Sequence, residues 1–80
     1  MKTLNDIAPG QSCKVIMVLG VGALKRRIID MGITPGTIIT MKRFAPFGDP
    51  IQISVRGYEL SIRKSEAENI KVESLERNLS

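Results

Sequence analysis

The 80-residue sequence contains no histidine, no tryptophan and a single cysteine, Cys13. Histidine is the side chain that most readily gains or loses a proton near neutral pH. A serine or cysteine nucleophile needs a base beside it, and that base is most often histidine. The composition therefore argues against nucleophilic catalysis, and we expect no catalytic residue and no enzymatic activity.

Ligands for a transition metal are also scarce, because the chain has no histidine and only one cysteine. Zinc and iron(II) sites built by protein alone draw several ligands from histidine, cysteine and carboxylates. The eight aspartates and glutamates are scattered along the chain. Glu66 and Glu68 are two positions apart, a spacing that does not bring side chains together on a helical turn. We expect neither a metal site nor a cofactor.

The chain also lacks a long apolar run. Residues 15–21 form its longest one, far short of the roughly 20 residues that a membrane-spanning helix needs. Residues 1–12 lack the apolar stretch of a signal peptide. A secreted protein of this size would usually carry several disulfides, whereas Cys13 has no possible partner in the chain. These features predict a cytoplasmic protein with no direct membrane insertion.

Short segments of strand-forming residues, separated by turn residues, predict an all-β domain. Several alternate cleanly between apolar and polar side chains, and Gly57 joins two of them into a hairpin. In the second half of that hairpin, Tyr58, Leu60 and Ile62 are expected to face the core. Cys13 is expected to be a buried, inert core residue. The predicted strands are residues 13–19, 37–44, 51–56, 58–64 and 69–75.

One helix interrupts this pattern at residues 23–32, where Leu24, Ile28 and Met31 form an apolar stripe. Gly32 fits the left-handed position that ends a helix, and the residue after it could pack back on the last turn. A second helical start is predicted further on, as a single turn. The sequence SEAE matches a capping box, with Ser65 as N-cap and Glu68 at the third helical position.

Strands this short in so small a chain usually close into a barrel, because closure removes exposed edges. We predict a small SH3-like barrel of about five strands, with one short helix inserted after the first strand and one capping-box turn before the last. Residues 1–73 are predicted to form this single domain. Residues 74–80 are predicted to be a frayed polar tail.

The formal charge of +4 permits an anionic partner without identifying one. A basic triplet on the predicted helix, together with aromatic residues, could bind a nucleic acid strand. We favour a solvated helix face and do not expect nucleic acid. Phe44 and Phe47 flank a segment too short to bury both rings, so either one ring closes the open end of the barrel or the loop binds a protein. The candidate partner-binding residues are Lys25, Arg26, Arg27, Arg43, Phe44, Pro46 and Phe47.

Residues 31–72, MGITPGTIITMKRFAPFGDPIQISVRGYELSIRKSEAENIKV, closely resemble the ferrous iron transport protein A family, FeoA. The matching positions are Gly32, Pro35-Gly36, Ala45-Pro46, Gly48-Asp49-Pro50-Ile51, Arg63-Lys64, Glu66-Ala67, Ile70 and Val72. One departure is Ile62, where leucine is usual.

The resemblance implies an SH3-like barrel and a small cytosolic accessory protein. Its implied partner is FeoB, the membrane iron(II) transporter with a cytosolic G-protein domain. The same domain occurs at the C-terminus of iron-dependent repressors. The alternative it implies is therefore a regulatory module of that type, with transition metal ion or nucleic-acid binding.

Overall fold

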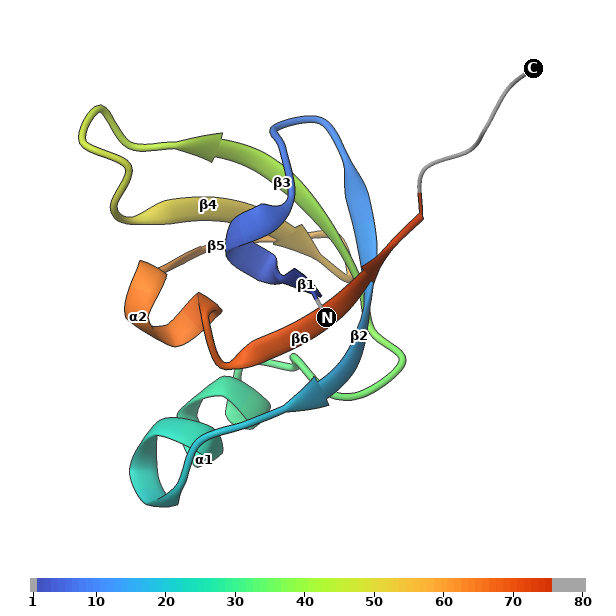
Figure 1. The fold of residues 1–80 in the computed structure, drawn as a ribbon, viewed down its shortest axis with the longest axis vertical. Helices are drawn as coiled ribbons and strands as arrows, with labels where there is room; N and C mark the ends of the chain where they lie inside the picture. Colours follow the sequence, from blue (N-terminus) through green and yellow to red (C-terminus); the bar gives the residue numbers. More distant parts are fainter. Residues whose placement is uncertain (1, 76–80) are drawn as a thin grey trace.

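A single antiparallel sheet of six strands makes up most of the computed structural model, which describes residues 2–75. The strands are β1 (Lys2–Thr3), β2 (Ser12–Val18), β3 (Ile38–Phe44), β4 (Ile51–Val55), β5 (Tyr58–Ile62) and β6 (Ile70–Ser74). Their order in the sheet is β1-β6-β2-β3-β4-β5, so β6 returns to lie between β1 and β2 (Figure 1). The predicted all-β class is confirmed, with a short N-terminal strand in addition.

Three short helical segments complete the fold: η1 (Leu4–Asp6), α1 (Gly22–Asp30) and α2 (Lys64–Ala67). The connection between β2 and β3 contains α1, and the connection between β5 and β6 contains α2 (Figure 1). No helix in residues 2–75 is long and apolar enough to cross a bilayer.

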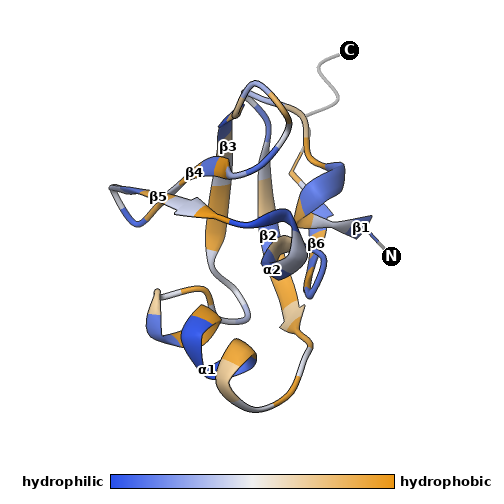
Figure 2. Ribbon diagram, turned by 90° about the vertical axis from the view of Figure 1, so that its left-hand side faces the viewer, coloured by the Kyte–Doolittle hydropathy of each residue, from blue (hydrophilic) through white to orange (hydrophobic). Residues whose placement is uncertain are grey.

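The core is formed by the inward side chains of the strands. In β4, Ile51, Ile53 and Val55 are buried and alternate with half-buried polar residues. Cys13 is also fully buried, as predicted. Burying one such aliphatic side chain contributes about 1.5–3 kcal/mol. Figure 2 shows apolar residues along the central strands and mixed polar and apolar residues on α1.

The end of α1 follows the predicted pattern closely. Gly32 has a φ of +89°. Its N–H donates to the carbonyl of Ile29 (2.9 Å), and the N–H of Ile33 donates to the carbonyl of Ile28 (3.3 Å). These two bonds form a Schellman motif, which satisfies carbonyls that the helix leaves without partners. Ile33 is fully buried and lies in the same apolar core as Ile28 of the helix. The predicted end of the helix is therefore confirmed.

A β-branched residue at Gly32 should destabilise the domain. Gly32→Val places a branched side chain at a left-handed φ, and we expect a loss of at least about 1 kcal/mol. For a domain of this size that lowers the melting temperature by about 4–8 °C. Gly32→Asn is the matched control and should lose less, because asparagine tolerates this conformation. A valine variant that melts with the parent would show that this φ carries no strain.

The predicted cap of α2 is wrong by two residues. The N-cap is Arg63, and the third helical position is Glu66. The Glu66 carboxylate accepts a hydrogen bond from the Arg63 backbone N–H (2.9 Å). The preceding strand ends at Ile62, whose side chain is buried. The helical turn therefore starts directly after the strand, before Ser65 can serve as the cap.

The predicted inward position of Tyr58 is also wrong. Its side chain is 72% exposed, Leu60 is half-buried, and of the three only Ile62 is fully in the core. Tyr58 follows the hairpin turn in β5, the last strand of the sheet. Within residues 2–75 no further strand lies beside β5, so alternation alone does not bury Tyr58.

Two features at the chain ends differ from the prediction. Strand β1 and η1 had not been predicted, and their segment contributes Leu4 and Ile7 to the core. Strand β6 ends at Ser74, within the strand predicted for residues 69–75 and one residue past the predicted domain boundary at 73. The rest of the predicted tail, residues 76–80, lies outside the described residues.

Candidate functional site

The loop of residues 45–50 joins β3 to β4 and is tied across its base. The Ala45 N–H donates to the Pro50 carbonyl (3.0 Å), and the Gly48 N–H donates to the Ala45 carbonyl (2.7 Å). Pro46 and Pro50 have fixed φ angles and further reduce the freedom of the chain. The loop therefore presents its side chains on a constrained backbone.

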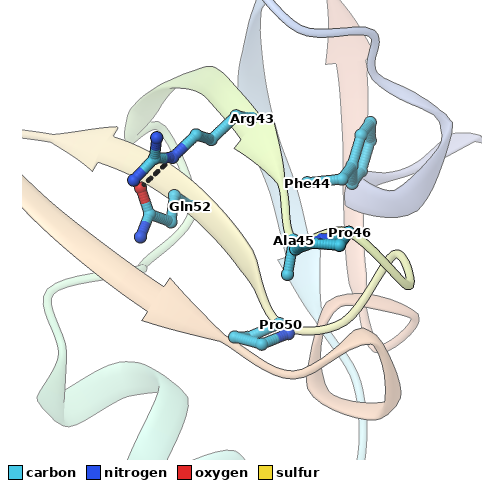
Figure 3. A pocket seen from close by; sticks show the side chains of 6 residues that line it. All are labelled: Arg43, Phe44, Ala45, Pro46, Pro50 and Gln52. Atoms are coloured by element: carbon cyan, nitrogen blue, oxygen red, sulfur yellow. Dashed lines mark hydrogen bonds between the residues drawn. The ribbon is translucent and has the colours of Figure 1, made fainter.

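The two phenylalanines of this region have different environments. Phe44 is half-buried and packs against the core, whereas Phe47 in the loop is 97% exposed. Arg43 and Phe44 are consecutive in a strand, so they point to opposite faces (Figure 3). The Phe44 ring therefore packs at the edge of the core. The Phe47 ring is exposed, which leaves it accessible to a partner protein.

A hollow of about 470 Å³ lies beside the loop, and Arg43, Phe44, Ala45, Pro46, Pro50 and Gln52 line it (Figure 3). Arg43 Nε donates to Gln52 Oε1 (2.8 Å) across the β3–β4 pair. This bond fixes the guanidinium over the strands. Its lining combines apolar atoms of Ala45, Pro46 and Pro50 with the hydrogen-bonded pair of Arg43 and Gln52.

The basic triplet of α1 divides between two places. Arg27 Nε lies 3.2 Å from Glu66 Oε2, and Arg27 lines a hollow of about 290 Å³ together with Asp49 and Pro50 of the loop. Lys25 and Arg26 line shallow hollows on and next to α1, and Arg27 shares one of them with Arg26. In Figure 1, α1 lies at the bottom and the loop at the upper left. The fold thus brings Arg27 to the loop and does not bring Lys25 and Arg26 there.

Helix α2 bonds both to Arg27 of α1 and to Asp49 of the loop, a connection that the sequence analysis does not predict. Glu66 is buried, and its two carboxylate oxygens accept from the Arg63 N–H and from Arg27. Asp49 Oδ1 accepts from the Lys64 N–H (3.0 Å), which holds the loop to the start of α2. The spacing of an N-cap and an acidic third residue could have indicated Glu66. The signal was hidden because Arg63 is not a usual N-cap type.

Cys13 carries no reactive chemistry in the folded protein. Burial raises the pKa of its thiol to about 11, and the nucleophile is the thiolate. We expect the thiol to react with a disulfide reagent at pH 8 at least tenfold more slowly in the native protein than in denaturant. Equal rates with and without denaturant would show that the thiol is accessible.

Within residues 2–75, no three histidine, cysteine or carboxylate side chains are grouped so that they could hold a metal ion. Tight transition-metal sites need several such ligands. We therefore expect no stoichiometric binding of iron(II) or zinc in a titration at low micromolar concentration. A one-to-one complex that a carboxylate or Cys13 substitution abolishes would contradict this expectation.

The FeoA domain family model matches residues 2–74. The chain belongs to the FeoA family. A curated relative from Porphyromonas gingivalis (strain ATCC BAA-308 / W83), the Fe(2+) transport protein A/Fe(2+) transporter FeoB fusion protein, is 32% identical over 75 residues. That match covers 94% of this chain and only 9% of the fusion protein, so this FeoA chain spans a small part of that relative's length.

Solved structures agree with the family. The FeoA-like protein of Clostridium acetobutylicum superimposes with a TM-score of 0.89 at 44% identity, covering 98% of this chain and 91% of that one. The FeoA of Stenotrophomonas maltophilia, solved as a zinc complex and described as an SH3 domain protein, gives 0.81 at 26% identity, covering 91% of each chain. The predicted SH3-like barrel is confirmed.

A manganese-dependent transcriptional repressor also shares the fold. Its TM-score is 0.84 at 17% identity, and the match covers 92% of this FeoA chain but 41% of the repressor chain. At that identity the likeness is one of fold alone.

Proposed function

We propose that this FeoA chain is a small cytoplasmic accessory protein of ferrous iron uptake that docks on or regulates an FeoB-type membrane transporter. The observation that carries the proposal is the fusion relative, in which a related segment and an FeoB transporter form one polypeptide. A fusion keeps two partners at a high effective concentration. Such an arrangement favours parts that act together.

The chemistry of the candidate site supports binding rather than catalysis. The loop of residues 45–50 carries an exposed aromatic ring, Phe47, beside an apolar hollow. Exposed aromatics on constrained loops are typical anchors of protein interfaces. Arg27 and Arg43 add positive charge near the loop, which would speed encounter with an acidic patch. We propose that the transporter's cytosolic portion, with its G-protein domain, is the surface that this loop meets.

The second candidate is a regulatory module of the iron-dependent repressor type. The shared fold with a manganese-dependent repressor motivates it, but the basic residues of this chain do not gather on one face. Arg27 is paired with Glu66 and lines the hollow beside the loop, which neither Lys25 nor Arg26 lines. We therefore rank nucleic-acid binding second.

A titration of the full chain against the cytosolic portion of an FeoB-type transporter tests the proposal. We expect saturable one-to-one binding, measured with and without guanine nucleotide, that weakens only modestly between 50 and 200 mM salt. Duplex DNA in a parallel titration should bind weakly and lose affinity steeply with salt. Tight DNA binding with no binding to the transporter portion would favour the repressor-type module instead.

A further inference from the structure

Apolar side chains are exposed to solvent on and just before α1. Val21 is the N-cap of the helix, and its side chain is 86% exposed. Ile29, in the last turn of the helix, is also exposed, although other apolar side chains of α1 pack against the core. In Figure 2, α1 and the connection that leads to it from β2 form the lower end of the molecule. These apolar groups therefore lie at one end of the protein.

Val21 does not stabilise the isolated helix. An N-cap side chain usually accepts a hydrogen bond from the first helical turn, and valine is among the poorest residues at this position. No side-chain hydrogen bond caps α1, and the exposed side chain buries little apolar area. Residues that break a local rule with no gain in stability are expected mainly at functional sites. The exposed valine therefore indicates a contact with something outside this chain.

Two basic side chains without ion-pair partners lie on the same face of α1. A shallow hollow of about 430 Å³ is lined by Gly22, Lys25, Arg26 and Ile29. No carboxylate lines it, and neither Lys25 nor Arg26 forms an ion pair within residues 2–75. The one carboxylate of α1 is Asp30, which lines the neighbouring hollow. The face around Ile29 therefore carries positive charge that no carboxylate in its hollow balances.

This combination of charge and apolar groups distinguishes between candidate occupants. A second copy of the chain in a symmetric dimer would place Lys25 and Arg26 near their own equivalents, which repel. A helix or extended segment of a partner protein usually binds in a groove, and this hollow is shallow. An anionic bilayer surface suits both features. Its headgroups attract basic side chains, and apolar side chains can lie at the boundary between headgroups and acyl chains.

We propose that this end of the molecule, residues 21–29, rests on the surface of a membrane that contains anionic lipids. Val21 and Ile29 would lie at the headgroup boundary, and Lys25 and Arg26 would contact headgroup phosphates. The contact is peripheral and spans no part of the bilayer. The proposal goes beyond transporter docking, because it names a second surface with a different partner. In Figure 1, α1 lies at the bottom and the loop of residues 45–50 at the upper left, so the two surfaces do not overlap.

A tryptophan introduced at this end reports on the contact, because the parent chain contains none. The full chain with Val21→Trp is mixed with vesicles of equal parts phosphatidylcholine and phosphatidylglycerol. We expect its fluorescence emission to move to shorter wavelength, since the indole would leave water. Phe47→Trp is the matched control on the exposed loop, and its emission should not move. No shift for Val21→Trp at millimolar lipid, or an equal shift for both variants, would overturn the proposal.

Co-sedimentation of the parent chain with the same vesicles measures the charge requirement. Anionic vesicles should bind it at least about tenfold better than pure phosphatidylcholine, and added salt should reduce the difference. Lys25→Ala with Arg26→Ala should weaken binding at least about fivefold. Lys42→Ala with Lys64→Ala removes the same charge from exposed positions elsewhere and should weaken binding less than about twofold. Equal effects of the two double variants would show attraction by net charge alone and would overturn the assignment to α1.

Val21→Thr separates membrane binding from folding. Threonine keeps the branched shape and supplies a cap oxygen, so the variant should melt no lower than the parent. Its vesicle binding should fall about threefold, because a hydroxyl replaces an apolar methyl group. Parent-like binding by this variant would overturn the role of Val21.

The other occupants are distinguishable outcomes. Binding to polyglutamate without binding to vesicles would overturn the proposal in favour of an acidic protein. A dimer in solution that Val21→Thr dissociates would overturn it in favour of a second copy of the chain. The titration against the soluble transporter portion contains no lipid, so saturable binding there without vesicle binding would overturn this proposal and leave the proposed function intact.

Discussion

Replacing Glu66 by alanine is expected to lower the free energy of unfolding by about 2–3 kcal/mol. The carboxylate is buried and accepts a backbone hydrogen bond from Arg63 as well as the Arg27 ion pair. Hydrogen bonds to a charged group contribute about 1.5–3 kcal/mol, and their loss leaves the Arg63 donor without its partner. In a domain of this size we expect the melting temperature to fall by about 10–20 °C.

Two control variants separate the contributions of Glu66. Glu66→Gln keeps an acceptor for the Arg63 N–H and loses only the ion pair, whose Arg27 side chain is 65% exposed. Exposed partners contribute about 0–1 kcal/mol, so this variant should melt close to the parent. Glu68→Ala changes an exposed glutamate on the same segment and should have no effect. If Glu66→Ala also melts with the parent, α2 is not held by this carboxylate.

The stability of α2 has a functional consequence. Asp49 attaches the candidate loop to the start of α2, and Arg27 reaches α2 from α1. Loosening this short helix should therefore disturb both the loop and the hollow of about 290 Å³ that Arg27 lines together with Asp49 and Pro50. Amide hydrogen exchange in the Glu66→Ala variant should quicken at Lys64, whose N–H bonds to Asp49.

Local sequence patterns predicted much of the fold because they act over a few residues. The helix stop at Gly32 needs only a left-handed φ and an apolar residue after it. The alternation of Ile51, Ile53 and Val55 needs only one buried face. Tyr58 obeys the same alternation and is nevertheless exposed. Its environment depends on its place at the end of an outer strand, which short-range periodicity does not contain.

The candidate site was less accessible to sequence reasoning because it is assembled from separate elements. The basic triplet of α1 appears as one unit in the sequence, yet the pairing of Arg27 with Glu66 requires α1 and α2 to meet. Asp49 and Lys64 come together across 15 positions of the chain. None of these relations leaves a local pattern.

Phe47→Ala is expected to weaken binding to the transporter's cytosolic portion about tenfold to hundredfold, or roughly 1–3 kcal/mol, as truncating an interface anchor does. The side chain is 97% exposed, so its removal takes no contact from the core. The constrained loop around it loses little conformational entropy on docking. The melting temperature of the variant should therefore stay within about 4 °C of the parent, since exposed substitutions usually change stability by less than about 0.5 kcal/mol.

The matched control for Phe47→Ala is Tyr58→Ala, which removes another exposed aromatic ring, 72% exposed and placed on β5 instead of the loop. If the loop is the anchor, the Tyr58 variant should bind the transporter portion within about threefold of the parent. Lys25→Ala with Arg26→Ala supplies a second comparison, because charges away from the anchor act mainly on association rate and act less at high salt. Surface-binding kinetics and a melting curve are recorded for each of the three variants on the same samples. If Phe47→Ala binds normally while Tyr58→Ala does not, the partner meets the β5 edge and the loop is not the docking surface.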